Sequence, residues 1–136
     1  MRITTVFNKL LNLQAARVVS VDGFDFDTLT VRVRPRAPKH RCPHCSFSTW
    51  ALYDRDERTW RHLALGRWRV LLTYPICRLR CPSHGVVTEG VPWATPRSRF
   101  TRDFEDLVAW TARTMDQTAV TRLLHISWVT VGTIIQ

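Results

Sequence analysis

Two short motifs with the same spacing constrain this chain more than any other feature. They are CPHC at residues 42–45 and CPSH at residues 81–84. Each motif sets two metal-ligand side chains three positions apart, so that both can reach one ion from a tight turn. The pair predicts a zinc ribbon, a small β structure built around one ion. The expected Zn²⁺ ligands are Cys42, Cys45, Cys81 and His84.

The fourth ligand is open to one alternative, because Cys77 lies four positions before Cys81 and can replace His84. The strand-like alternation of ICRLRC favours Cys77 in the core, and His44 is expected to face solvent. Four protein ligands leave no position for water, so the metal is expected to be structural and not catalytic.

Two other interpretations of the cysteines stay open. Four ordinary buried thiols are common, but they leave the repeated Cys-Pro spacing unexplained. A redox protein can use a Cys-x-x-Cys pair such as Cys42 and Cys45 as a dithiol. Tight retention of one zinc ion would exclude that function.

The charge of the chain points to nucleic acid. Lys and Arg number 20 against 11 Asp and Glu, which gives a net charge of +9, and the only lysines are Lys9 and Lys39. Arginine pairs with phosphates through two hydrogen bonds and stacks on bases. No apolar run reaches the roughly 20 residues of a spanning helix, and the start lacks a signal-peptide pattern. We therefore expect a cytoplasmic, nucleoid-associated protein that binds double-stranded DNA and no membrane.

The N-terminal part predicts a helix followed by a β-hairpin. A helix is expected over about residues 4–14, with Val6, Leu10, Leu11 and Leu13 on its apolar side. ARVVSV and TLTVRVRP are β-branched segments separated by DGFDFD, whose Asp-Gly pair is typical of a hairpin turn.

The middle of the chain predicts a small sheet that joins the two motifs. The basic, proline-containing stretch RPRAPKHR leads into the first motif, and strand-like segments follow it up to the second. Trp60 and Trp68 are expected in the core and not as platforms for bases. Asp54, Asp56 and Glu57 are expected in a charged turn and not in a two-metal catalytic centre.

From residue 97 onward the apolar period becomes helical. One helix is expected after Thr101 as N-cap. Its apolar face comprises Phe104, Leu107, Val108, Thr111 and Ala112.

QTAVTRLLHISWVTVGTII then has the spacing of a helix-turn-helix, with Ser127 capping the second helix. His125 takes the turn position usually held by Gly, and histidine tolerates a positive φ. The expected apolar positions are Val120, Leu123, Leu124, Ile126, Val131, Ile134 and Ile135.

The exposed N-terminal end of the second helix is where such a motif meets base edges. The residues expected to contact DNA there are Trp128, Val129, Thr130 and Thr133. Arg97, Arg99, Arg102 and Arg122 are expected to contact phosphates, which gives affinity without sequence choice. A packed pair of helices that binds no DNA is the alternative.

In the order of its parts, including RLRCPSHG, TEGVPWATPRSRFT and ISWVTV, the chain resembles the N-terminal region of ISL3 family transposases. That resemblance implies a zinc ribbon, a helix-turn-helix, and recognition of the terminal inverted repeats of an insertion sequence. His84 departs from the family, whose second motif commonly carries two cysteines. Family members continue into a catalytic domain with a DDE carboxylate triad; we expect that domain to be absent here and the chain not to be an enzyme.

The sequence therefore predicts an α+β protein, a small antiparallel β zinc ribbon followed by a helical tail. The expected domains are 1–40 (helix and hairpin), 41–92 (zinc ribbon) and 97–136 (helix-turn-helix, ending within its last helix). The expected function is that of the non-catalytic DNA-binding part of a transposase. A stand-alone transcriptional regulator and an inhibitory module that pairs with full-length transposase or with its own copies remain alternatives.

Overall fold

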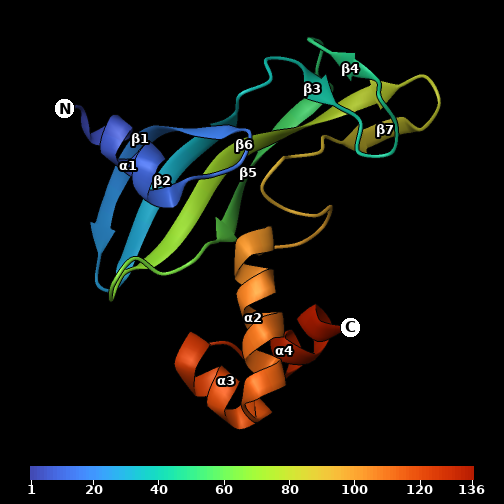
Figure 1. Cartoon of the computed structure of the whole chain (residues 1–136). Coiled ribbons are helices and arrows are strands. Elements are labelled where there is room, and N and C mark those ends of the chain that lie inside the picture. The colour runs from blue at the N-terminus through green and yellow to red at the C-terminus, as the bar shows by residue number, and fades with distance from the viewer. The chain divides into compact units, whose positions relative to one another are not determined.

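The computed structural model describes residues 1–136, which form two compact units, Met1–Thr101 and Arg102–Gln136. The first unit contains every strand and the helix α1 (Ile3–Leu11), and the second contains three helices (Figure 1). The predicted α+β class, with β structure first and helices after it, is confirmed. The segments 1–40 and 41–92 both fall within the first unit.

The main sheet of the first unit has the strand order β1-β2-β6-β5. β1 pairs antiparallel with β2, and β5 pairs antiparallel with β6, but β2 and β6 run parallel. β7 pairs antiparallel with the C-terminal end of β6. The strands are β1 (Ala16–Asp25), β2 (Thr28–Pro35), β5 (Asp54–Arg61), β6 (Arg69–Cys81) and β7 (Gly85–Thr88). One strand, β6, therefore runs from the centre of this sheet to the second motif.

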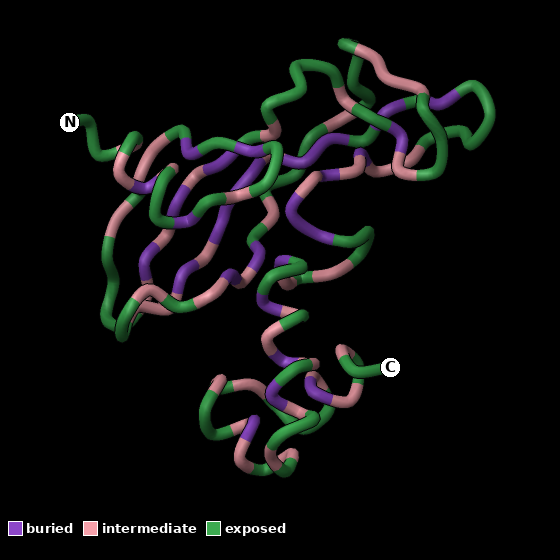
Figure 2. The backbone as a smooth tube through the Cα atoms, viewed as in Figure 1, coloured by how far each residue is buried: buried purple, intermediate pink, exposed green.

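Buried residues follow the central strands β2 and β6 (Figure 2). Leu29, Val31 and Val33 alternate with more accessible residues along β2, as a strand with one buried face requires. Trp60 is 1% exposed and meets Trp93 edge to face at 5.3 Å. The expected core role of the tryptophans is confirmed for Trp60, and Trp68 packs against the same core while partly buried.

Helix α1 covers this core with a face that includes Leu11, as predicted, but not Leu10. Phe7 and Leu11, one helical turn apart, are buried, whereas Leu10 is 54% exposed. The predicted apolar face with Leu10 was wrong, because a residue next to Leu11 in sequence points about 100° away from it around the helix. The helix also ends earlier than predicted, since Asn12 takes a left-handed conformation with φ 47°.

The hairpin of β1 and β2 is confirmed, but its turn lies later than predicted. β1 continues through Gly23 to Asp25, and the tip is formed by Phe26 and Asp27. Two register shifts in β1 accommodate the extra residues as bulges. Phe24 packs edge to face on Trp68 at 4.7 Å, which explains why the Asp-Gly segment extends as strand instead of turning.

The acidic segment near residue 54 is a strand and not the charged turn that was predicted. Asp54 and Glu57 lie in β5, where Asp54 pairs with Arg78 and Glu57 with Arg32. The two carboxylates are therefore matched to arginines on β6, the adjacent strand, and on β2, the strand beyond it.

The second unit consists of α2 (Arg102–Thr114), α3 (Gln117–Leu124) and α4 (Trp128–Ile135). On α2, Phe104, Val108 and Thr111 are buried, as the helical period predicted. Val120 and Val131 are the buried residues of α3 and α4.

Two predicted core residues of this unit are surface residues. Leu123 is 57% exposed and Ile135 is 50% exposed. Their assignment to the core was wrong, because helices of eight residues bury only one narrow side. No single helix of the chain is long and apolar enough to cross a membrane; α3 and α4 reach that length only when added across a bend of 107°.

Candidate metal centre and helix-turn-helix

The first motif lies in the turn between two short strands, β3 (His40–Arg41) and β4 (Ser48–Thr49), which pair antiparallel. The backbone N–H of Cys42 donates to the carbonyl of Phe47 at 2.9 Å and closes the turn. Cys42 is buried and Cys45 is exposed. In this turn, therefore, the Cys42 thiol lies in the interior and the Cys45 thiol is accessible to solvent.

The second motif lies in the turn between β6 and β7. Cys81 is the last residue of β6 and pairs with Gly85, the first residue of β7. Gly85 has φ 72°, a conformation that glycine adopts without steric cost. His84, directly before it, is thereby directed back towards Cys81.

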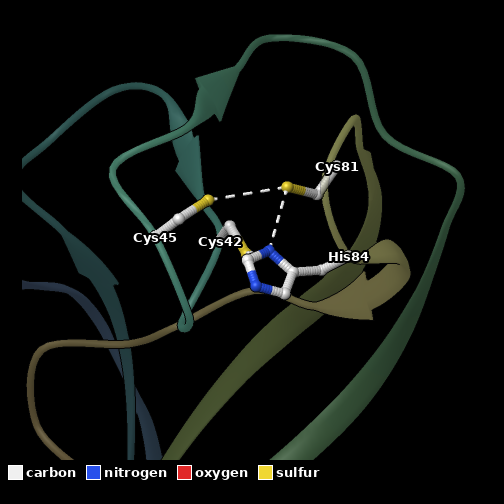
Figure 3. Close-up of side chains that lie close together, drawn as sticks. All are labelled: Cys42, Cys45, Cys81 and His84. Atoms are coloured by element: carbon white, nitrogen blue, oxygen red, sulfur yellow. Dashed lines mark hydrogen bonds between the residues drawn. The ribbon is translucent and has the colours of Figure 1, made fainter.

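The two turns bring Cys42, Cys45, Cys81 and His84 together (Figure 3). The Sγ atoms of Cys45 and Cys81 are 3.5 Å apart, and His84 Nδ1 lies 3.4 Å from Cys81 Sγ and 3.7 Å from Cys42 Sγ. Tetrahedral zinc with ordinary bond lengths separates two sulfurs by about 3.8 Å, and a sulfur from a nitrogen by about 3.6 Å. The donor atoms and their spacing fit one tetrahedral ion.

The electrostatics of the quartet also favour a cation. Desolvation opposes ionisation of Cys81, but hydrogen bonds from the His84 side chain and the Ser83 backbone outweigh it and lower the pKa of Cys81 to about 6. At Cys45 a backbone hydrogen bond at Phe47 favours the thiolate, yet desolvation and the nearby sulfurs of Cys81 and Cys42 raise the pKa. The Cys81 thiolate therefore forms easily, whereas ionisation of Cys45 beside it is unfavourable. A bound cation stabilises both thiolates and so removes this difference.

Cys77 is separate from the quartet and fully buried, as the strand alternation predicted. Burial, followed by the hydrogen bond and charge of Glu89, raises the pKa of the Cys77 thiol to about 12. This side chain is therefore a protonated thiol in the interior. His44 is exposed, as expected, with its ring 5.3 Å from that of His84.

A buried polar cluster around Glu89 joins the ribbon to the main sheet and was not predicted. The Glu89 carboxyl group accepts hydrogen bonds from the Tyr74 hydroxyl at 3.0 Å and the Cys77 backbone N–H at 2.8 Å. It also lies 3.2 Å from Nδ1 of His40, in β3. No spacing rule links these positions, because the three segments meet only in the folded chain.

The helical unit has the geometry of a helix-turn-helix. α3 and α4 are bent by 107° across residues 125–127, within the range of roughly 90–120° for this motif. Ser127 Oγ accepts from the N–H of Thr130 at 3.1 Å, so the predicted cap is confirmed. His125 has φ 54° and supplies the left-handed turn residue, as expected.

The expected base-contacting residues gather at the N-terminal end of α4. Trp128 is 55% exposed and Val129 is 78% exposed, and Thr133 is exposed one turn later. Thr130 is half-buried, with its hydroxyl 2.8 Å from that of Ser127. The start of α4 is thus an accessible surface with apolar and hydroxyl groups.

The four expected phosphate-contacting arginines are all exposed, but they belong to both units. Arg97 and Arg99 lie in the segment that follows β7, Arg102 opens α2, and Arg122 is on α3. Within the first unit, Arg97 and Arg99 line a groove of about 960 Å³ together with Arg58.

Comparison with known proteins gives two family matches. Residues 38–84 match the zinc-finger of transposase IS204/IS1001/IS1096/IS1165, and residues 89–136 match the helix-turn-helix domain of transposase family ISL3. The first match contains the whole Cys and His quartet, and the second contains α2, α3 and α4.

Two curated relatives are transposases for insertion sequence element IS1557 from Mycobacterium tuberculosis, in strains CDC 1551 / Oshkosh and ATCC 25618 / H37Rv. Each is 37% identical over 99% of this chain and 32% of its own length. The chain thus spans about a third of the length of these relatives. No solved structure matches.

Proposed function

Because the chain belongs to the ISL3 family of transposases, we propose that it binds the terminal inverted repeats of an insertion sequence as double-stranded DNA. The second unit reads the base sequence through α4, and the arginines hold the phosphate backbone. Binding of an element's ends is the step that brings a transposase to its site of action. This region supplies binding, and it does not itself cleave DNA.

The observation that carries this proposal is the start of α4. Ser127 caps the helix, so its first turn is ordered, and the Trp128 and Val129 side chains are left in solvent beside it. Exposed apolar side chains at a helix N-terminus suit contact with thymine methyl groups in the major groove. A helix that only packed against its neighbours would bury them.

The metal proposed for the quartet is Zn²⁺, which accepts three thiolates and one imidazole at tetrahedral positions. It supplies no reaction chemistry, because Cys42, Cys45, Cys81 and His84 fill all four positions. Those residues hold two turns together across a small apolar cluster with Leu79. The ion therefore stabilises the ribbon.

The test is a binding titration with the full chain and two labelled duplexes, one carrying the element's terminal repeat and one with the same bases scrambled. Val129→Ala removes an exposed contact at the start of α4, and Ile135→Ala is the matched control at the exposed C-terminal end of the same helix. Val129→Ala removes two methyl-sized groups worth about 0.8 kcal/mol each when buried, so it is expected to reduce the preference for the repeat by up to about 15-fold.

Equal affinity of the unchanged protein for both duplexes would refute the proposal. Preference for the promoter of its own gene over the repeat would show a transcriptional regulator instead. Failure to bind either duplex, together with co-purification with full-length transposase, would show an inhibitory module.

A further inference from the structure

A second basic surface lies in the first unit, around the basic stretch RPRAPKHR. It is a groove of about 490 Å³ between the end of β2, the connection to β3 and the start of β5. We call it the basic groove. Its exposed polar and aromatic lining consists of Arg34, Arg36, Lys39, Trp50 and Arg55.

The positive charge of the basic groove is not compensated by acids. Arg32, which also lines it, pairs with Asp22 and Glu57. The other four cations form no ion pair in the structure, and the carboxyl group that reaches the groove is that of Glu89, 5% exposed and hydrogen-bonded to Tyr74 and Cys77. Four exposed positive charges therefore face one buried acid.

Strand pairing increases this charge further. Arg34 of β2 lies directly opposite Arg17 of β1 in the antiparallel register, and both are exposed. Like charges at opposed positions of an antiparallel pair are destabilising. An arrangement that costs stability in the free protein is relieved when an anion binds.

The backbone around the cations is held in place. Pro35 and Pro38 restrict the connection between β2 and β3, and the N–H of Arg36 donates to the carbonyl of Ala15 at 2.8 Å. Trp50, 65% exposed, also lines the groove. Cations on a constrained backbone lose less conformational entropy on binding than cations on a mobile tail.

We propose that the basic groove is a second DNA-binding surface, which contacts the phosphates of duplex DNA without reading its sequence. The inference rests on the proposed function, because the duplex concerned is the one that α4 recognises. Four exposed cations at one groove fit the regular negative charge of a duplex backbone better than a single small anion. The groove therefore adds affinity, and α4 adds sequence choice.

The test compares two double variants of the full chain that remove the same charge. Arg36→Gln/Lys39→Gln changes the basic groove. Lys9→Gln/Arg67→Gln changes exposed cations of α1 and of the turn after Gly66, which line neither groove of the first unit. Each phosphate contact contributes a slope of about −0.9 to the dependence of log affinity on log salt. The groove variant is expected to reduce the slope by about 1.8 and the affinity about 30-fold at 0.15 M salt, for the repeat and for scrambled duplex alike.

The control is expected to change the slope by less than half a unit, and thermal unfolding of both variants checks that they are folded. If the groove variant binds like the control while the unchanged protein still prefers the repeat, the groove inference is wrong and the proposed function stands. If the unchanged protein shows no preference but the groove variant still loses affinity for any duplex, the inference stands and repeat recognition is wrong. Loss of affinity for single strands alone would overturn the duplex assignment in favour of base stacking on Trp50.

Discussion

Replacing Cys45 by alanine tests the metal centre sharply, because Cys45 is exposed. Substitutions at exposed positions without special contacts change the free energy of unfolding by about 0.5 kcal/mol or less. Cys77 is the matched control, since it is fully buried and separate from the quartet. Cys77→Ala removes about one methyl-sized group from the interior together with the thiol hydrogen bond to Glu89, at a total cost of about 2 kcal/mol. Without metal, therefore, Cys77→Ala is the more destabilising change.

Bound zinc reverses that order. Structural zinc contributes about 10–16 kcal/mol in zinc-finger peptides at pH 7, so one ligand in four accounts for roughly 3 kcal/mol. Cys45→Ala is then expected to cost about 3 kcal/mol and Cys77→Ala still about 2 kcal/mol. The difference disappears when a chelator removes the metal, because neither variant has a metal to lose.

The assay combines zinc content per chain with denaturant unfolding, each with and without chelator. Cys77→Ala is expected to retain one zinc per chain, and Cys45→Ala to bind zinc about 150-fold more weakly, so that it loses the ion at a lower chelator concentration. Hydrogen exchange locates the damage: the amides of Cys42, Glu89 and Gly90, which close the ribbon, should lose protection in Cys45→Ala. The central strand β2 should keep its protection, because its core lies in the main sheet. An unchanged zinc affinity in Cys45→Ala, or an unchanged order of stabilities, would refute the reasoning.

Three further predictions concern single interactions. Ser127→Ala removes the cap of α4 and should lower the stability of the helical unit by about 1 kcal/mol, seen in thermal unfolding by circular dichroism; no change would mean that packing alone orders the helix. Glu89→Gln leaves one acceptor oxygen for the donors around it and should cost about 1–3 kcal/mol in denaturant unfolding, and a neutral result would show that the cluster is not stabilising. The hydrogen bond from Arg78 lowers the pKa of Asp54, so this pair stabilises the fold above the ordinary carboxyl pKa and loses its effect as pH falls through the lowered value. Arg78→Gln should therefore raise the Asp54 pKa in an NMR titration, and an unshifted carboxyl would contradict the pairing.

The parts of the candidate site that could be predicted from sequence are those set by spacing within a short segment. The two-residue spacing predicted the two ligand pairs, because a tight turn brings the members of one pair to one point. The meeting of the two pairs is a contact between segments 36 residues apart, and the structure confirms it. The cap at Ser127 and the turn at His125 were predictable for the same reason, since their partners lie within five residues.

Long-range contacts decided the rest. The order of β1, β2, β6 and β5, with its parallel pairing of β2 and β6, brings together segments that carry no local sign of each other. The pairing of β6 with β7 places Glu89 beside Cys77 and Tyr74. The strand order brings arginines of β2 and β5 to one groove, which Trp50 also lines.

The sequence alone therefore determined which residues can hold a metal and which segment forms the helix-turn-helix, because those properties depend on turns and caps a few residues long. Only the tertiary structure decided which faces are buried, as the exposure of Leu10 and Leu123 shows. The tertiary structure also decided that exposed arginines and a lysine gather at the basic groove without acidic partners. Burial and charge balance depend on neighbours that are distant in the chain, and periodicity does not contain that information.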